Sequence, residues 1–192
     1  MATQKTLTDF TTALIGGGAR ANLFEVSMGN LPSNAGTLPD KFTMLCKSAN
    51  LPASNVGNID VPFRGRIFKV AGDRTFDTWQ ITVINDTDFA IRTIMENWMQ
   101  HIAQYKDASG VTNPTDYMAN ATVIQLNRNA SSMSATSSAG VVNAKEYRFE
   151  DIFPTNISAI DLSFDSSDQI EEFTVEFQVN YWYPTGTGGK TN

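Results

Sequence analysis

The side chains that could form an active site are few and scattered in this sequence. It has one cysteine, Cys46, and one histidine, His101, so neither a disulfide within the chain nor the usual zinc ligand sets can form. Cys46 belongs to an alternating apolar run, which predicts a small buried side chain rather than a nucleophile. His101 lies off the apolar stripe of its predicted helix and lacks a partner for acid–base chemistry. We therefore predict no catalytic residue and no cofactor.

Gly72-Asp73-Arg74 is the strongest loop-like signal. Glycine followed by aspartate predicts a reversal or kink between two strands, which Asp73 or Asp77 would fix by pairing with Arg74 or Arg66. A phosphate-cradling loop would need more glycines and a helix directly after it, whereas a strand pattern follows here.

Asp86 and Asp88 could suggest a calcium loop, but the glycine and the later glutamate of that motif are missing. The run 85–87 can instead accept hydrogen bonds from the free N–H groups of a helix start, where negative charge is favoured. These acids therefore predict the beginning of a helix, and no metal site is expected.

Hydrophobic periodicity predicts a mainly β chain with one main helix. Trp79, Ile81 and Val83 alternate with polar residues, as in a half-buried strand. A helix over about 86–105 follows, with its apolar side formed by Ile91, Ile94, Met95, Trp98 and Ile102. Further strands are expected at 24–28, 42–46, 63–70, 117–127, 145–153, 160–164 and 173–183, with a turn at 154–156 and Pro184 ending the last strand.

The chain of 192 residues is expected to form a single domain over 1–192. Its less regular segments are a flexible N-terminal arm (1–20) with a short helix over 6–14, a long interaction loop (48–62), a Ser/Ala-rich loop (129–143) and a flexible C-terminal tail (184–192). The loop 48–62 has more apolar character than a solvated loop needs, which favours a role in binding.

Net charge and hydropathy exclude several classes. A formal charge of −6 argues against nucleic-acid binding, and Arg64, Arg66 and Lys69 are too few for strong phosphate affinity. These cations are expected to pair with carboxylates of another subunit. The sequence has no apolar run long enough to span a membrane. Its N-terminal residues do not fit the pattern of a secretory signal, so none is expected. The lone cysteine is consistent with folding in a reducing cytoplasm.

Several runs together resemble the tail tube proteins of T4-like contractile bacteriophages. The most specific is VAGDRTFDTWQITVIND, within FRGRIFKVAGDRTFDTWQITVINDTDFAIRTIMENW. NLFEV, CKSANLPA and KEYRFEDIFPTNISAIDLSFDSSDQIEEFTVEFQVNYW occur in the family's order and extend the resemblance over nearly the whole chain. On these residues the sequence is identified as a member of that family, with its motif at Gly72, Asp73, Arg74, Phe76 and Trp79.

The resemblance implies a fold and a function. Such proteins have an antiparallel β-sandwich or barrel-like domain with one helix, and six copies form a ring with a continuous inner β-barrel. Rings stack into a hollow tube inside a contractile sheath, in contact with baseplate, tape-measure and tail-terminator proteins, and DNA passes through without specific binding. The implied location is the virion tail, with assembly in the host cytoplasm.

We assign surfaces on that basis. Contacts between subunits or rings are expected at Leu51, Val56, Ile59, Val61, Arg64 and Arg66. Glu172 and Glu176, on the polar side of the last strand, are expected to face the lumen. The alternatives are the tube of a DNA-free contractile injection system, such as a tailocin or secretion-system tube, and, more distantly, a β-sandwich carbohydrate binder.

Overall fold

The computed structural model describes residues 5–14, 18–126, 143–165, 167 and 169–185. The chain divides into two compact units: one holds Met1–Glu25, Val123–Tyr147 and Pro184–Asn192, and the other holds Val26–Thr122 and Arg148–Tyr183. In the described part, no helix is both long and apolar enough to cross a membrane. The predicted Ser/Ala-rich loop and most of the C-terminal tail lie outside the described residues.

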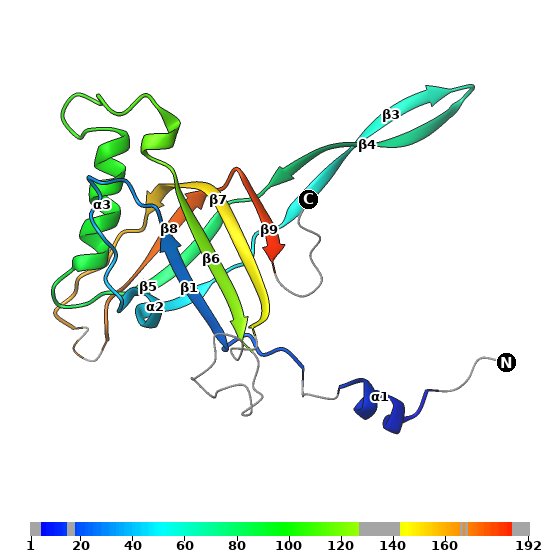
Figure 1. Ribbon diagram of the computed structural model, residues 1–192, viewed down its shortest axis with the longest axis horizontal. Helices are drawn as coiled ribbons and strands as arrows, with labels where there is room; N and C mark the ends of the chain where they lie inside the picture. Colours follow the sequence, from blue (N-terminus) through cyan, green and yellow to red (C-terminus); the bar gives the residue numbers. More distant parts are fainter. Residues whose placement is uncertain (1–4, 15–17, 127–142, 166, 168, 186–192) are drawn as a thin grey trace. The chain divides into compact units, whose positions relative to one another are not determined.

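The larger of the two described sheets has seven strands (Figure 1). Its order is β1-β6-β7-β8-β5-β2, and β9 also pairs with β7. The strands are β1 (Phe24–Gly29), β2 (Cys46–Ala49), β5 (Trp79–Ile84), β6 (Ala119–Leu126), β7 (Asn143–Ile157), β8 (Glu172–Gln178) and β9 (Tyr181–Thr185). The pairs β2–β5, β5–β8 and β7–β8 are antiparallel, which confirms a mainly β, antiparallel fold.

The core lies on one face of this sheet. β5 and β8 both alternate in burial, and their register pairs Trp79 with Phe177, Ile81 with Val175 and Val83 with Phe173. Because opposed residues of antiparallel strands share a face, all six side chains point to the same side. The other face carries the polar residues between them, and the Thr82 and Thr174 hydroxyls meet there at 3.3 Å.

The main helix, α3 (Ala90–Ile102), covers the core face. Ile91, Met95 and Trp98 are its buried residues, and the Trp98 ring lies 5.9 Å from Phe177 of β8. The Trp98 Nε1–H donates to the Tyr117 carbonyl at 2.7 Å, so the indole is satisfied inside the core. The predicted helix was correct in its position and face, but it is shorter than 86–105 at both ends.

The prediction of a loop over 48–62 is wrong for most of this segment. Residues Ser54–Phe63 form strand β3, which pairs antiparallel with β4 (Arg66–Phe76) to make a separate two-stranded sheet. Figure 1 shows this β3–β4 hairpin extending away from the seven-stranded sheet as a twisted ribbon. Asparagine and proline disfavour a strand, but Ile59, Val61 and Phe63 alternate, and a partner strand supplies the hydrogen bonds.

Residues 42–46 were predicted as a strand and contain a helical turn instead. Helix α2 (Phe42–Leu45) precedes β2, and a 3-10 helix, η1 (Pro114–Asp116), follows α3. Phe42 and Cys46 are both buried while Met44 is 88% exposed. Spacing of four places Phe42 and Cys46 on one side of a helix, so the apparent alternation was misleading.

Three predictions near the C-terminus are also wrong. Residues 154–156 lie within β7 at a register irregularity, because β8 continues to pair across them. Residues 160–164 are an irregular connection, since no strand pairs with them. The last strand is two strands, β8 and β9, and Pro184 lies inside β9 instead of ending it.

The smaller unit contains helix α1 (Leu7–Ala13). The Thr6 hydroxyl accepts from the Asp9 amide and the Asp9 carboxylate accepts from the Thr6 amide, a capping box that begins the helix. Leu7, Phe10 and Leu14 are all exposed. Within this unit the Gln125 amide also donates to the carbonyls of Arg20 and Leu23, which ties the chain before β1 to the end of β6.

Candidate assembly surfaces

Cys46 and His101 take structural positions. Cys46 is buried, its thiol lies 3.6 Å from the Ser48 carbonyl, and burial raises its pKa to about 12, so the thiol stays protonated at neutral pH. The Nδ1 atom of His101 lies 3.1 Å from the amide nitrogen of Asn34, within hydrogen-bonding distance. In the described ranges no three His, Cys, Asp or Glu side chains gather as metal ligands.

Gly72 and Asp73 do not reverse the chain. They lie inside β4, where two residues oppose the single Gly57 of β3, so the kink is a β-bulge. A Cβ at Gly72 would come within 3.2 Å of the Gly57 carbonyl carbon, which explains a glycine at this position. Asp73 and Arg74 are exposed, and the ion pairs proposed for the turn are not formed among the described residues.

Phe76 and Trp79 connect the hairpin to the core. Trp79 is completely buried; its ring stacks on Phe149 with centroids 4.8 Å apart and lies 5.3 Å from Phe177. Phe76 makes an edge contact with Trp182 at 6.1 Å. These family-motif residues therefore form the base from which the exposed hairpin projects.

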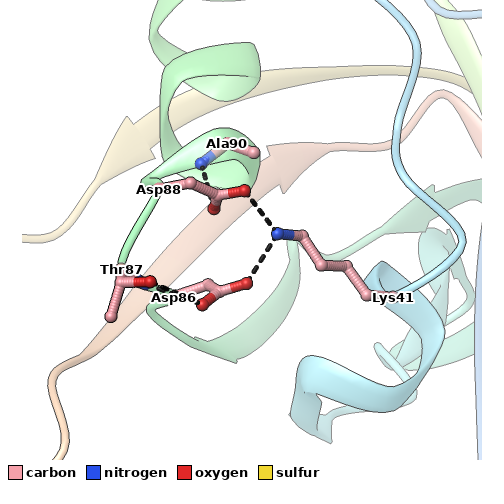
Figure 2. Close-up of polar contacts among 5 residues, drawn as sticks. All are labelled: Lys41, Asp86, Thr87, Asp88 and Ala90. Carbon is pink, nitrogen blue, oxygen red and sulfur yellow. Dashed lines mark hydrogen bonds and ion pairs between the residues drawn. The ribbon is translucent and has the colours of Figure 1, made fainter.

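Asp86 and Asp88 lie at the start of α3 as predicted, and the Asp88 carboxylate accepts from the amide of Ala90, the first residue of the helix. Both carboxylates also bind a lysine that was not predicted. Figure 2 shows the Lys41 Nζ between the two carboxylates, at 2.6 Å from each. Hydrogen bonding by Lys41, and then by the backbone amides of Thr87 and Ala90 respectively, lowers the pKa of both carboxyls, and the carboxylates raise the pKa of Lys41. This cluster joins the segment before α2 to the start of α3, whose N-cap Phe89 has a left-handed backbone.

The residues predicted to contact other subunits lie on or near the exposed hairpin. Leu51, Val56, Ile59 and Val61 are 43–54% exposed, and Arg64 and Arg66 lie at its tip. Sequence reasoning missed Phe63, Ile67, Phe68 and Val70, which are 41–67% exposed on the same hairpin. The available signal was the two-residue Arg64-Gly65 connection between alternating runs, which is typical of a hairpin.

Glu172 and Glu176 lie on the polar face of β8, away from the core. Glu172 is held by Lys47 at 2.6 Å, whereas Glu176 is half-buried and lies across from Gln80 of β5. A second set that the sequence did not single out is the β7–β8 connection, where Leu162, Phe164 and Ile170 are exposed.

The described residues thus include large apolar side chains exposed on the hairpin and on the β7–β8 connection. A profile described as phage tail tube protein matches residues 19–185. The tail tube protein gp19 of Enterobacteria phage T4 is 34% identical over 164 residues, covering 85% of this chain and 90% of the relative. The tail tube protein of Serratia phage KSP90 is 25% identical over 135 residues, covering 70% of each chain. The chain therefore belongs to the phage tail tube protein family.

The fold is shared with contractile injection systems. A chain of the sheath/tube terminator structure from an extracellular contractile injection system aligns with a TM-score of 0.59 at 14% identity, covering 88% of this chain and 97% of the other. A chain of the sheath-tube complex of such a system aligns with a TM-score of 0.55, covering 96% of this chain and 100% of the other. At this identity the similarity concerns the fold alone.

Proposed function

We propose that the chain polymerises into rings of six that stack into the hollow tail tube of a contractile phage. The observation that carries this proposal is the β3–β4 hairpin, whose large apolar side chains are exposed in the single subunit. Monomeric proteins rarely expose a contiguous apolar surface of this kind unless it meets a partner. In a member of the tail tube family, the simplest partner is a second copy.

The polar face of the seven-stranded sheet is the proposed inner wall of the tube. α3 covers the core face, so the opposite face of β5 and β8 is left for solvent, and it bears Gln80, Thr82, Thr174, Glu176 and Gln178. A polar wall in a protein of charge −6 repels DNA phosphates, so DNA would slide through without being held.

Ring closure is proposed to use the ends of the sheet. The strand order ends at β1 on one side and β2 on the other. An open strand edge invites pairing with another chain, and closing sheets around a ring removes such edges. A ring needs a heterologous interface, in which one patch meets a different patch on the next copy.

The proposed partners follow from this arrangement. The sheath surrounds the tube, and the baseplate, tape-measure and tail-terminator proteins meet it inside and at its ends. The proposed location is the virion tail, after assembly in the host cytoplasm, and no enzymatic activity is proposed. The 34% identity to a T4 tail tube protein favours a phage tube over the DNA-free injection tube, which has support only from the shared fold.

Apolar-to-acidic substitutions on the hairpin and just before it test the proposal. Leu51→Asp with Ile59→Asp should leave a folded subunit, because both side chains are exposed, and should prevent long tubes by introducing charge at the interface. Folding is checked by circular dichroism and tube length by negative-stain microscopy. Thr75→Asp, a charge introduced at an exposed polar position of the same hairpin, is the control. Normal tubes from the double variant would show that the hairpin does not form the contact between copies.

A further inference from the structure

The tip of the β3–β4 hairpin carries an arginine in an unfavourable backbone conformation. Arg64 and Gly65 have φ of 47° and 81°, so both central residues of the two-residue turn are left-handed. Such turns favour Asn, Asp or Gly at the first position, where a long side chain adopts this conformation at a cost. A strained residue at an exposed tip points to a role outside the subunit's own fold.

One face of the hairpin is apolar and ends in a cation. The cross-strand pairs Ile59–Val70, Val61–Phe68 and Phe63–Arg66 share this face, and their five apolar side chains are 41–67% exposed. The opposite face carries the Asp60–Lys69 ion pair at 2.9 Å. Arg64 lies over the Phe63 ring, 5.4 Å from its centroid. The tip therefore offers two guanidinium groups beside an apolar strip.

A surface with the complementary composition lies in the connection between β7 and β8. We call its described residues, 158–165, 167 and 169–171, the acidic loop. Leu162, Phe164 and Ile170 are 79%, 107% and 72% exposed. Asp161 and Asp165 are exposed beside them, and within the described ranges neither carboxylate has an ion-pair partner.

The acidic loop also lines an open hollow of about 300 Å³. Its lining includes Asp161 and Ser163, together with Glu171 and Glu172, which accept hydrogen bonds from Asn85 and Lys47. The carboxylate of Asp161, which has no ion-pair partner among the described residues, suits a cationic group better than an apolar one. An arginine side chain matches this chemistry because its planar guanidinium can bond two carboxylate oxygens at once.

The hairpin and the acidic loop lie at opposite ends of the same sheet. β5 begins with Trp79 just after the hairpin ends at Phe76, whereas its last residue, Ile84, pairs with Glu172, where the acidic loop joins β8. The six residues of β5 separate the two ends by about 17 Å at 3.3 Å per residue. In Figure 1 the hairpin extends from one end of β5 and the orange connection loops at the other.

We infer that the hairpin tip of one copy docks on the acidic loop of the next copy along the tube. Arg64 and Arg66 pair with Asp161 and Asp165, and the apolar strip of the hairpin packs on Leu162, Phe164 and Ile170. Because the two surfaces differ and lie at opposite ends of the subunit, the contact is heterologous and repeats without closing, as stacking requires. This inference rests on the proposed function and names the surface that receives the hairpin.

Charge reversal on both sides tests the contact in the full-length protein. Arg64→Glu with Arg66→Glu, and separately Asp161→Arg with Asp165→Arg, should each lower the tube fraction at least tenfold in sedimentation and negative-stain microscopy. Combining all four substitutions should restore tubes, because opposite charges face each other again. Lys69→Gln, on the other face of the hairpin, should assemble like the unaltered protein.

A milder variant separates the turn from the contact. Arg64→Asn fits the left-handed turn better than arginine, so the hairpin should remain formed while the tube fraction falls. Normal tubes from the Asp161/Asp165 variant, or no rescue by the fourfold variant although circular dichroism shows it folded, would overturn the inference and leave the proposed function intact. Failure of the unaltered protein to assemble at all would contradict both.

Discussion

Lys41 illustrates how charged residues act in this protein. It bridges Asp86 and Asp88 ahead of α3, and all three side chains are partly or largely exposed, at 33–57%. These hydrogen bonds hold the segment before α3, where the N-cap residue, Phe89, has no side-chain group that could accept from the helix amides. Asp86 and Asp88 lie at a helix start as the sequence predicted, but no local pattern predicts their bond to Lys41, because this lysine lies over forty positions away.

Replacing Lys41 should make stability less dependent on pH. The lowered pKa values of Asp86 and Asp88 give stability that is present above their ordinary value of 3.8 and is lost as pH falls through the lowered values. The raised pKa of Lys41 gives stability that is present below 10.5 and is lost as pH rises through the raised value. Lys41→Met should therefore lower Tm most near neutral pH.

Thermal melts from pH 2 to 11 provide the measurement. The difference in Tm between the unaltered protein and Lys41→Met should shrink at both ends of the range. Lys106→Met, in the exposed loop after α3, serves as the control. A constant difference across the range would mean that Lys41 contributes by packing and not by charge.

Trp79 should be the most sensitive single residue for folding. It is fully buried between Phe149 and Phe177, so Trp79→Ala should reduce the free energy of unfolding by about 3–5 kcal/mol. Trp79→Phe should cost much less, because it keeps an aromatic ring and removes an indole N–H that has no partner among the described residues. Urea unfolding of both variants checks this order, which equal losses would contradict.

At the scale of elements, apolar periodicity predicted the helices and strands that bury one face in the core. α3 and β5 were predicted correctly because each buries one of its faces in the core. Burial of one face makes apolar residues recur at a regular spacing in the sequence. The prediction placed a strand at 63–70, which overlaps β4, but missed β3 and the turn at Arg64-Gly65. β3 was missed because the exposed strands of the hairpin are held mainly by pairing with each other. The predicted strand at Ile160–Phe164 failed for the opposite reason: it alternates but has no partner strand, and its apolar residues are exposed.

The hairpin should be loosely held in the free subunit and rigid in the tube. Residues 54–76 are almost all exposed, so opening the hairpin costs little buried surface. Backbone amides of β3 and β4 should exchange with solvent at least tenfold faster than those of β5 and β8 before assembly. Hydrogen exchange with mass spectrometry should show them slowed in tubes, whereas equal rates in both states would exclude the hairpin from the contacts.

At the scale of the whole molecule, the proposed function depends on repetition of the subunit. The family assignment came from residues spread along nearly the whole chain, and the comparisons confirm it over residues 19–185. The lumen-facing role of Glu172 and Glu176 stays a prediction, because which face of the sheet lines the lumen depends on how several copies assemble. Glu172 already forms an ion pair with Lys47, so a substitution there would also break that ion pair.

Glu176→Lys should therefore be the cleaner probe of the proposed channel. A lysine facing the lumen in every copy would attract phosphates, so tubes should form normally while genome delivery slows. Phage complemented with this variant would be compared with Glu176→Gln in single-round infection and potassium-efflux measurements. Unchanged delivery by the lysine variant would place this face away from the DNA.

Negative-stain microscopy of the purified full-length protein tests the proposed self-assembly most directly. We predict sixfold rings and hollow tubes of stacked rings, which lengthen as protein concentration increases. A population that stays monomeric at every concentration, with the circular dichroism of a folded β protein, would contradict self-assembly as the function of this chain.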